Sequence, residues 1–208
     1  MPATILRTET GSYCTNCYIV YDKNNVGVII DPGDEAEEIE RLVKAYGLDI
    51  KAILLTHGHC DHLMAAAPLQ EKYAYPLYVH RDDAKMVEEC VLQGRIIGLR
   101  CAKAPRVDHY LQESEPLTFG GLSFRFLHTP GHTPGGVVIL CGNDAFCGDT
   151  IFRGSVGRTD LPGSSQRALF DSICAKVYTL PESVVLHPGH GPDTTVQYEK
   201  RNNPFVRP

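Results

Sequence analysis

A histidine-rich stretch at residues 57–62, HGHCDH, places four metal-ligand side chains close together in the chain. In an extended or turning chain, side chains two positions apart project to the same side, so His57 and His59 can chelate one ion. Asp61 and His62 come after the turn, where a first helical turn would aim them at a second ion nearby. The alternative is a solvated polar loop, but further ligand-type residues elsewhere in the chain favour a metal site.

Three further ligand-type residues, His132, Asp149 and His190, each follow a glycine after a short apolar run. The complete set of five imidazoles and two carboxylates contains no thiolate, which favours Zn, Fe or Mn over Cu(I) or an iron–sulfur cluster. A closed structural zinc site needs only about four ligands, so the larger set leaves positions open for water and substrate. We therefore expect a catalytic site with two divalent metal ions. Zinc is the expected metal, with iron or manganese as alternatives.

The ligand groups stand at the ends of predicted strands, where the loops of an α/β sheet gather ligands. Residues 52–55 form a fully apolar run, typical of a strand buried on both faces, and the run stops just before the histidine-rich stretch. Residues 122–126 alternate between apolar and polar side chains, as a half-buried strand does. The other predicted strands are 17–21 and 26–30 in one hairpin, 137–141 and 145–147 in another, and single runs at 77–80 and 184–186.

Apolar residues at helical spacing predict a helix from Ala36 to Tyr46, with Asp34 placed to cap its start and Gly47 to end it. Further helices are expected near residues 63–73, 82–99 and 165–178. No linker or low-complexity stretch divides the chain. We therefore expect one α/β (α+β) domain over residues 1–208, built from two similar halves.

Composition excludes several function classes. The 208 residues carry a formal net charge of −5, and the basic residues are scattered rather than clustered, which argues against a nucleic-acid partner. No apolar run approaches the ~18 residues of a membrane-spanning helix, so we expect no membrane partner. The N-terminus lacks the pattern of a secretory signal, which predicts a cytoplasmic protein. The eight cysteines contain a single C-x-x-C pair and are expected to be reduced thiols outside the metal site.

Four motifs together resemble the metallo-β-lactamase superfamily: THGHCDH at 56–62, TPGHTPG at 129–135, GDT at 148–150 and PGHG at 188–191. The segments CGDTIF at 147–152 and GRTDLPG at 157–163 are most similar to its glyoxalase II (hydroxyacylglutathione hydrolase) branch, especially to short single-domain members. The resemblance spans nearly the whole chain. It implies an αββα sandwich, in which two mixed β-sheets pack face to face, helices lie outside, and the metals sit at one edge of the sheets.

The resemblance also implies a role for each ligand residue. In the family pattern, the first metal is bound by His57, His59 and His132, the second by Asp61, His62 and His190, and Asp149 bridges the two. A hydroxide between the metals would attack a thioester carbonyl, with Asp61 orienting it, so Asp61 and Asp149 are the expected catalytic residues. Metal binding lowers the pKa of water to about 7, which would make such a nucleophile available at neutral pH.

Two further residues are candidates for supporting roles. Arg158 could bind a carboxylate of the substrate through paired hydrogen bonds, although an ion pair with Asp160 is an equal alternative. Asp31 ends a predicted strand and could hold the free ring nitrogen of a ligand histidine, unless it is a plain turn residue. From the short stretch after His190, we expect no C-terminal helical domain of the kind that holds glutathione in two-domain relatives. We therefore expect a small thioester substrate but leave its thiol carrier open, as we do the oligomeric state.

Three other functions are also compatible with the sequence. Persulfide dioxygenases of the same superfamily use a single non-haem iron at positions that match His57, His132 and Asp149. A lactonase or β-lactamase activity would use the same two-metal site. A binding module without catalysis is the remaining alternative, and metal content together with turnover would separate these possibilities.

Overall fold

The first half of the chain forms a mixed six-stranded sheet. The computed structural model describes residues 3–207, and its strands in this sheet lie in the order β1-β2-β3-β4-β5-β6. The first three strands pair antiparallel and the last three add in parallel, so the carboxyl ends of β3 and β4 meet at one edge. The strands are β1 (Thr4–Thr10), β2 (Thr15–Tyr21), β3 (Val26–Ile30), β4 (Asp49–Leu54), β5 (Leu77–His80) and β6 (His109–Leu111).

The second half forms another mixed six-stranded sheet, in the order β14-β13-β10-β9-β8-β7. β10 and β13 run parallel, which brings their carboxyl ends side by side. The strands are β7 (Leu117–Phe119), β8 (Leu122–His128), β9 (Val137–Cys141), β10 (Asp144–Gly148), β13 (Val185–Pro188) and β14 (Thr194–Thr195). A small hairpin of β11 (Ile151–Phe152) and β12 (Ser155–Val156) follows β10.

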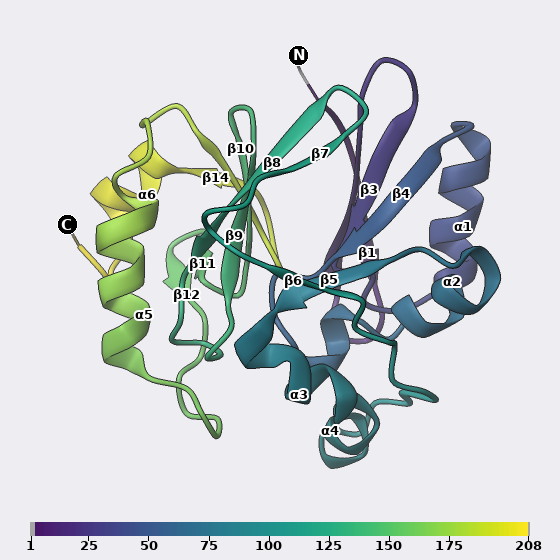
Figure 1. The fold of residues 1–208 in the computed structure, drawn as a ribbon. Coiled ribbons are helices and arrows are strands. Elements are labelled where there is room, and N and C mark those ends of the chain that lie inside the picture. The colour runs from purple at the N-terminus through teal and green to yellow at the C-terminus, as the bar shows by residue number, and fades with distance from the viewer. Residues whose placement is uncertain (1–2, 208) are drawn as a thin grey trace.

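Helices cover the outer face of each sheet (Figure 1). α1 (Ala36–Ala45) and α2 (Ala66–Tyr73) lie beside the first sheet, and α5 (Gln166–Ser172) and α6 (Val196–Asn202) lie beside the second. The other helical segments are η1 (Cys60–His62), η2 (Arg81–Asp83), α3 (Ala84–Glu88), α4 (Cys90–Ile97) and the π-helical continuation of α5, η3 (Ile173–Val177).

Three apolar clusters hold these layers together. The central one lies between the sheets, where Ile30 and Leu54 from the first sheet meet Phe124 and Phe146 from the second, all of them fully buried. The other two fill the space between each sheet and its helices. Burial of such side chains contributes about 1.5–3 kcal/mol each, so the sandwich is held mainly by its three apolar layers. The expected αββα sandwich of two mixed sheets is confirmed.

Some local expectations were wrong. Asp34 does not cap α1: its Oδ1 accepts a hydrogen bond from the Glu35 amide, and Glu35, in the left-handed region, is the residue that precedes the helix. The helix expected at residues 63–73 begins only at Ala66, as α2, and a separate short helix, η1, precedes it at Cys60–His62. No helix in residues 3–207 has the length and apolar character needed to cross a membrane.

Candidate metal centre

The loops that follow β4, β8, β10 and β13 meet at one edge of the sandwich and carry the expected ligands. His57 and His59 follow β4, and η1 after them holds Asp61 and His62. The structure brings together all seven predicted ligand residues in two clusters that share this edge: His57, His59 and His132 in the first, Asp61, His62 and His190 in the second, and Asp149 between them.

The first cluster is made of three imidazoles. Nδ1 of His59 lies 2.9 Å from Nε2 of His132, and the His57 ring packs edge-on against both. His57 and His132 are buried, while His59 is partly open to solvent. These three rings present one nitrogen each to a common point, as ligands of one ion do.

The second cluster combines two imidazoles with a carboxylate. Nε2 of His62 and Nε2 of His190 are 3.3 Å apart. Oδ2 of Asp61 lies 3.7 Å from the first of these nitrogens and 3.4 Å from the second. The three atoms therefore surround a site that could hold one cation.

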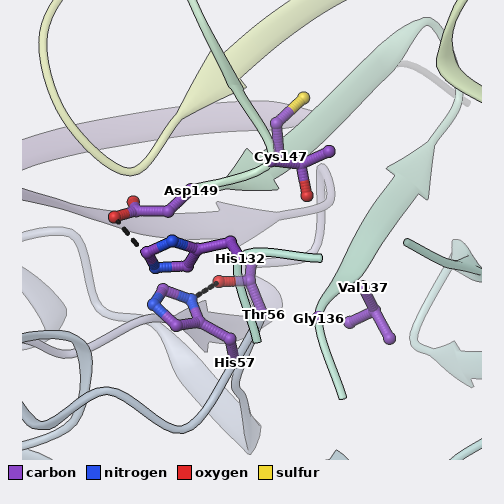
Figure 2. A pocket seen from close by; sticks show the side chains of 8 residues that line it. Thr56, His57, His132, Gly136, Val137, Cys147 and Asp149 are labelled. Atoms are coloured by element: carbon purple, nitrogen blue, oxygen red, sulfur yellow. Dashed lines mark hydrogen bonds and ion pairs between the residues drawn. The ribbon is translucent and has the colours of Figure 1, made fainter. Parts of the chain in front are cut away.

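The Asp149 carboxylate lies between the two clusters. Its Oδ2 is 3.5 Å from Nε2 of His132, and its Oδ1 is 3.3 Å from Nε2 of His62 and 3.7 Å from Nε2 of His190. Figure 2 shows the carboxylate directed at the His132 ring, beside the pocket lined by His57 and Thr56. One oxygen faces each cluster, which is the arrangement that a bridging ligand requires.

Hydrogen bonds outside the clusters fix which ring nitrogen His57, His132 and His190 present. His132 Nδ1 donates to the Arg158 carbonyl at 2.8 Å. His190 Nδ1 donates to the Tyr13 carbonyl at 3.1 Å. In His57, Nδ1 lies 3.0 Å from the Thr56 hydroxyl, which itself donates to Asp31. Metal-binding histidines commonly donate their second nitrogen in this way, which leaves the first one free as a ligand.

The donor atoms fit a bound cation. Nδ1 of His62 donates to Asp31 and Nδ1 of His190 donates to a carbonyl, so the two Nε2 atoms face each other next to a carboxylate. This arrangement calls for a positive charge between the two nitrogens, which a bound cation would supply. In addition, Nε2 of His57 and Oδ1 of Asp149 are buried without a hydrogen-bond partner in the protein, although buried polar atoms are normally paired.

The charge environment divides the histidines into two kinds. Burial, reinforced by neighbouring histidines, lowers the pKa of His57 well below its usual value and lowers that of His59 to about 4, so both rings are neutral. Burial also lowers the pKa of His62, but Asp149 and Asp61 outweigh it and raise that pKa well above the usual value. The site therefore favours positive charge where the carboxylates meet His62.

Both carboxylates of the centre are ionised at neutral pH. Burial would raise the pKa of Asp149, but His62 and then His132 hold it well below its usual value. Burial likewise opposes ionisation of Asp61, and His62 and His190 more than offset this effect. Burial raises the pKa of the intervening Cys60 thiol to about 12, so it is a neutral thiol at neutral pH in the metal-free protein. All eight cysteines are free thiols.

Asp31 holds the free ring nitrogen of a ligand histidine, one of the two roles expected from the sequence. Its Oδ2 is 3.0 Å from Nδ1 of His62, and its two oxygens also accept from the amide and hydroxyl of Thr56 at 2.8 and 2.6 Å. The carboxylate thereby supports His62 directly and His57 through Thr56. With three hydrogen bonds already made, it acts on the ligands rather than as one of them.

We expect Asp31→Asn to lower metal affinity about 10- to 100-fold, because the partners that orient ligand histidines have effects of this size. Asp31 has a left-handed backbone (φ 49°), which asparagine also tolerates, so the substitution removes the charge without new backbone strain. Competition with a chromophoric chelator measures the change. A purely local turn role would leave the metal affinity at the wild-type value.

Arg158 lies at the rim with its guanidinium exposed. It forms a two-point ion pair with Asp160, at 2.7 and 2.9 Å, which is the alternative considered from the sequence. Its backbone carbonyl, in contrast, holds His132. The structure therefore shows a positioning contact for Arg158, while its binding of a substrate carboxylate stays a prediction.

Close backbone approaches around the centre were missed from the sequence. A Cβ at Gly189 would lie 2.4 Å from Oδ1 of Asp149 and 2.5 Å from Cε1 of His62. A Cβ at Gly157 would lie 1.8 Å from the Asp149 carbonyl oxygen and 3.1 Å from Nδ1 of His132. Both glycines let the chain pass directly against ligand residues, and their only signal in the sequence is their place in the PGHG and GRTDLPG segments.

A second group of ligand-type side chains lies away from the centre. The rings of His80 and His128 stack with centroids 4.0 Å apart, and Asp82 lies beside them. Nδ1 of His80 accepts the Asp82 amide, and Nε2 of His128 donates to the Pro134 carbonyl. These hydrogen bonds and the stacking account for the group without a metal.

Comparisons with known proteins agree with this geometry. The sequence model described as "Metallo-beta-lactamase superfamily" matches residues 14–195. The hydroxyacylglutathione hydrolase GloC of Haemophilus influenzae is 36% identical, and the alignment covers 92% of each chain. TTHA1623 in a di-iron-bound form is 43% identical, with a TM-score of 0.90, covering 97% of this chain and 100% of that one. The BLEG-1 B3 metallo-beta-lactamase is 36% identical, with a TM-score of 0.92, covering 98% and 99%.

Proposed function

The chain belongs to the metallo-β-lactamase superfamily, and we propose that within it the protein is a dinuclear thioesterase that hydrolyses a small hydroxyacyl thioester. The family match and the His/Asp clusters identify a metal-dependent hydrolase of this fold. The position of Asp149, with one carboxylate oxygen facing each cluster, supports a centre with two metals. GloC, whose name describes it as a hydroxyacylglutathione hydrolase, is similar over nearly the whole chain.

The residues that would hold the metals follow from the two clusters. His57, His59 and His132 would hold one ion, Asp61, His62 and His190 the other, and Asp149 both. Divalent cations bound there would lower the pKa of water to about 7 and polarise the carbonyl oxygen of the substrate. A homologous structure holds two irons, so zinc and iron are both candidates for this chain.

The protein itself orients the reacting groups. The Asp61 carboxylate is ionised and lies at the partly open side of the centre, with its side chain 14% exposed. There it can accept a hydrogen bond from the attacking water and fix the direction of attack. Because His57, His62 and His132 are buried and their second nitrogens are engaged, the ligand set needs little reorganisation during the reaction.

A shallow surface depression lies beside Asp61. Ser12 and Tyr13 line it together with the apolar side chains of Met64 and Leu99. We propose that the acyl part of the substrate lies against this mixed surface, which offers both polar and apolar contacts. The thiol carrier would extend toward the exposed rim, where Arg158 lies.

The proposal is tested with purified protein of measured metal content and a panel of substrates. We expect hydrolysis of S-lactoylglutathione or of the lactoyl thioester of another thiol. Oxygen-dependent consumption of a glutathione persulfide by protein with one iron would instead assign a dioxygenase. Because BLEG-1 is described as a B3 metallo-beta-lactamase, a chromogenic β-lactam belongs in the panel, and its preferential hydrolysis would overturn the thioesterase proposal.

Arg158→Ala tests the nature of the thiol carrier. If the guanidinium binds a carboxylate of glutathione, the KM for S-lactoylglutathione should rise about tenfold, the size expected for a charge-assisted hydrogen bond, with kcat unchanged. A thioester without a carboxylate on its carrier should show no change. Asp160→Ala is the matched control, because it breaks the same ion pair and leaves the guanidinium free for substrate. Equal KM values in wild type and Arg158→Ala would assign the arginine to the ion pair alone.

A further inference from the structure

A buried carboxylate outside the ligand set joins the two loops that carry the three-histidine cluster. Asp83, at the end of η2, is fully buried. Its Oδ2 accepts a hydrogen bond from the Gly58 amide at 2.9 Å, and its Oδ1 accepts one from the Gly135 amide at 2.6 Å. One side chain therefore links two segments that are far apart in the sequence.

The two amides belong to the segments that position the first metal. Gly58 stands between His57 and His59, in the loop after β4 of the first sheet. Gly135 lies in the same loop as His132, between β8 and β9 of the second sheet. Each sheet contributes its own ligands, so the spacing among the three rings depends on how these loops are held relative to each other.

The packing around Asp83 leaves the loops little freedom. A Cβ at Gly135 would lie within 2.6–2.7 Å of three Asp83 atoms, and a Cβ at Gly58 would lie 2.9 Å from the Asp83 carbonyl oxygen. On the same segment of chain, the Gln93 amide donates to the Gly58 carbonyl and accepts from the Cys60 amide, both at 3.2 Å. The segment from η2 to α4 thus forms a support directly behind the ligand loops.

We propose that Asp83 is a positioning residue for the first metal: by accepting one amide from each loop, it sets the distance between the His57 and His59 pair and His132. This inference rests on one part of the proposed function, that the three histidines bind a metal. It concerns the metal affinity of that site and does not depend on the identity of the substrate.

A general structural role would give a different pattern, and Asp22 provides the comparison. Asp22 is also a buried carboxylate that joins two segments, accepting amides of Asn24 and Val26 in its own turn and of Gly121 after β7. It lies before β3, at the end of the first sheet opposite the ligand loops. Backbone hydrogen bonds lower the pKa of Asp22. Asp83 also accepts backbone hydrogen bonds, but burial outweighs them and raises its pKa.

The test measures metal affinity at each site by chelator competition in wild type, Asp83→Asn, Asp83→Ala and the control Asp22→Asn. The variant His132→Ala assigns the two affinities to the two sites, because it should lose the ion held by the three histidines. We expect Asp83→Asn, which keeps one acceptor, to weaken that ion about 10- to 100-fold and to leave the other ion within about threefold. Asp83→Ala should weaken it further. Asp22→Asn should lower the unfolding midpoint and leave both affinities unchanged.

Three results would overturn the inference. Asp83→Asn could bind both ions as tightly as wild type, or it could weaken both ions equally with a matching loss in the unfolding midpoint of the metal-free protein. In either case Asp83 would have no specific effect on the first site, and the proposed function would stand. A wild-type chain that binds no metal at the three histidines would overturn both proposals together.

Discussion

Asp149→Ala is expected to lower thioester turnover by about a thousandfold or more, because the substitution removes the carboxylate whose two oxygens face the two clusters. Metal ions supply several kcal/mol of transition-state stabilisation, and each ~1.4 kcal/mol corresponds to a tenfold change in rate. Without this carboxylate, His62 and His132 lose the negative charge that faces them. We therefore expect the metal content to fall together with kcat/KM.

The measurement is kcat/KM and metal content on the same protein sample. Asp149→Asn serves as a graded variant, because it keeps an oxygen that can face one cluster and should retain more metal than the alanine variant. Asp160→Ala is the matched control, since it removes an aspartate at the rim that contacts no ligand residue. Turnover and metal content near wild type in Asp149→Ala would contradict the assignment of this residue as the bridge.

Gly189→Ala is expected to reduce turnover about a hundredfold, although glycine offers no functional group. The added Cβ would lie 2.4 Å from Oδ1 of Asp149 and 2.5 Å from Cε1 of His62, so both ligand residues must shift. Displacements of about 1 Å in a reacting centre have effects of this size. Kinetics and metal content report the loss.

The control for this prediction is Gly191→Ala, two residues further along the same loop. Gly191 has a left-handed backbone (φ 77°), but a Cβ there would meet nothing within 4 Å. The control therefore strains the loop without placing an atom in the metal centre, and its turnover should stay within a few-fold of wild type. Equal losses in both variants would show that loop strain, rather than contact with the ligands, determines the effect.

Short apolar runs made most of the fold predictable from the sequence. β3 and the second half of β4 are apolar because both faces of the first sheet are covered there, by the second sheet and by helices. β1 was missed, since its sequence TILRTET is largely polar and only one of its residues is buried. α6, with the sequence VQYEKRN, was missed for a similar reason, because it has few apolar residues. Its start is capped by the Thr195 hydroxyl, which accepts a hydrogen bond from the Tyr198 amide, but a threonine alone does not predict a helix in so short a segment.

The site was predictable where side-chain type carries the chemistry and was hidden where backbone groups do. The seven ligand residues stand out because imidazole and carboxylate recur after apolar runs. The carbonyls of Tyr13 and Arg158, which hold His190 and His132, have no sequence signature, since every residue has a carbonyl. Asp83 was missed because its partners are the amides of two glycines in distant loops.

If two metal ions act together in one hydrolytic centre, stepwise metal reconstitution should show it. Metal-free protein is titrated with Zn²⁺ or Fe²⁺, and thioester turnover is followed against equivalents of metal per chain. The two clusters joined by Asp149 predict that turnover continues to rise through the second equivalent and then stops. Full turnover at one equivalent, or turnover that does not depend on metal, would rule out a hydrolytic centre that needs two metals.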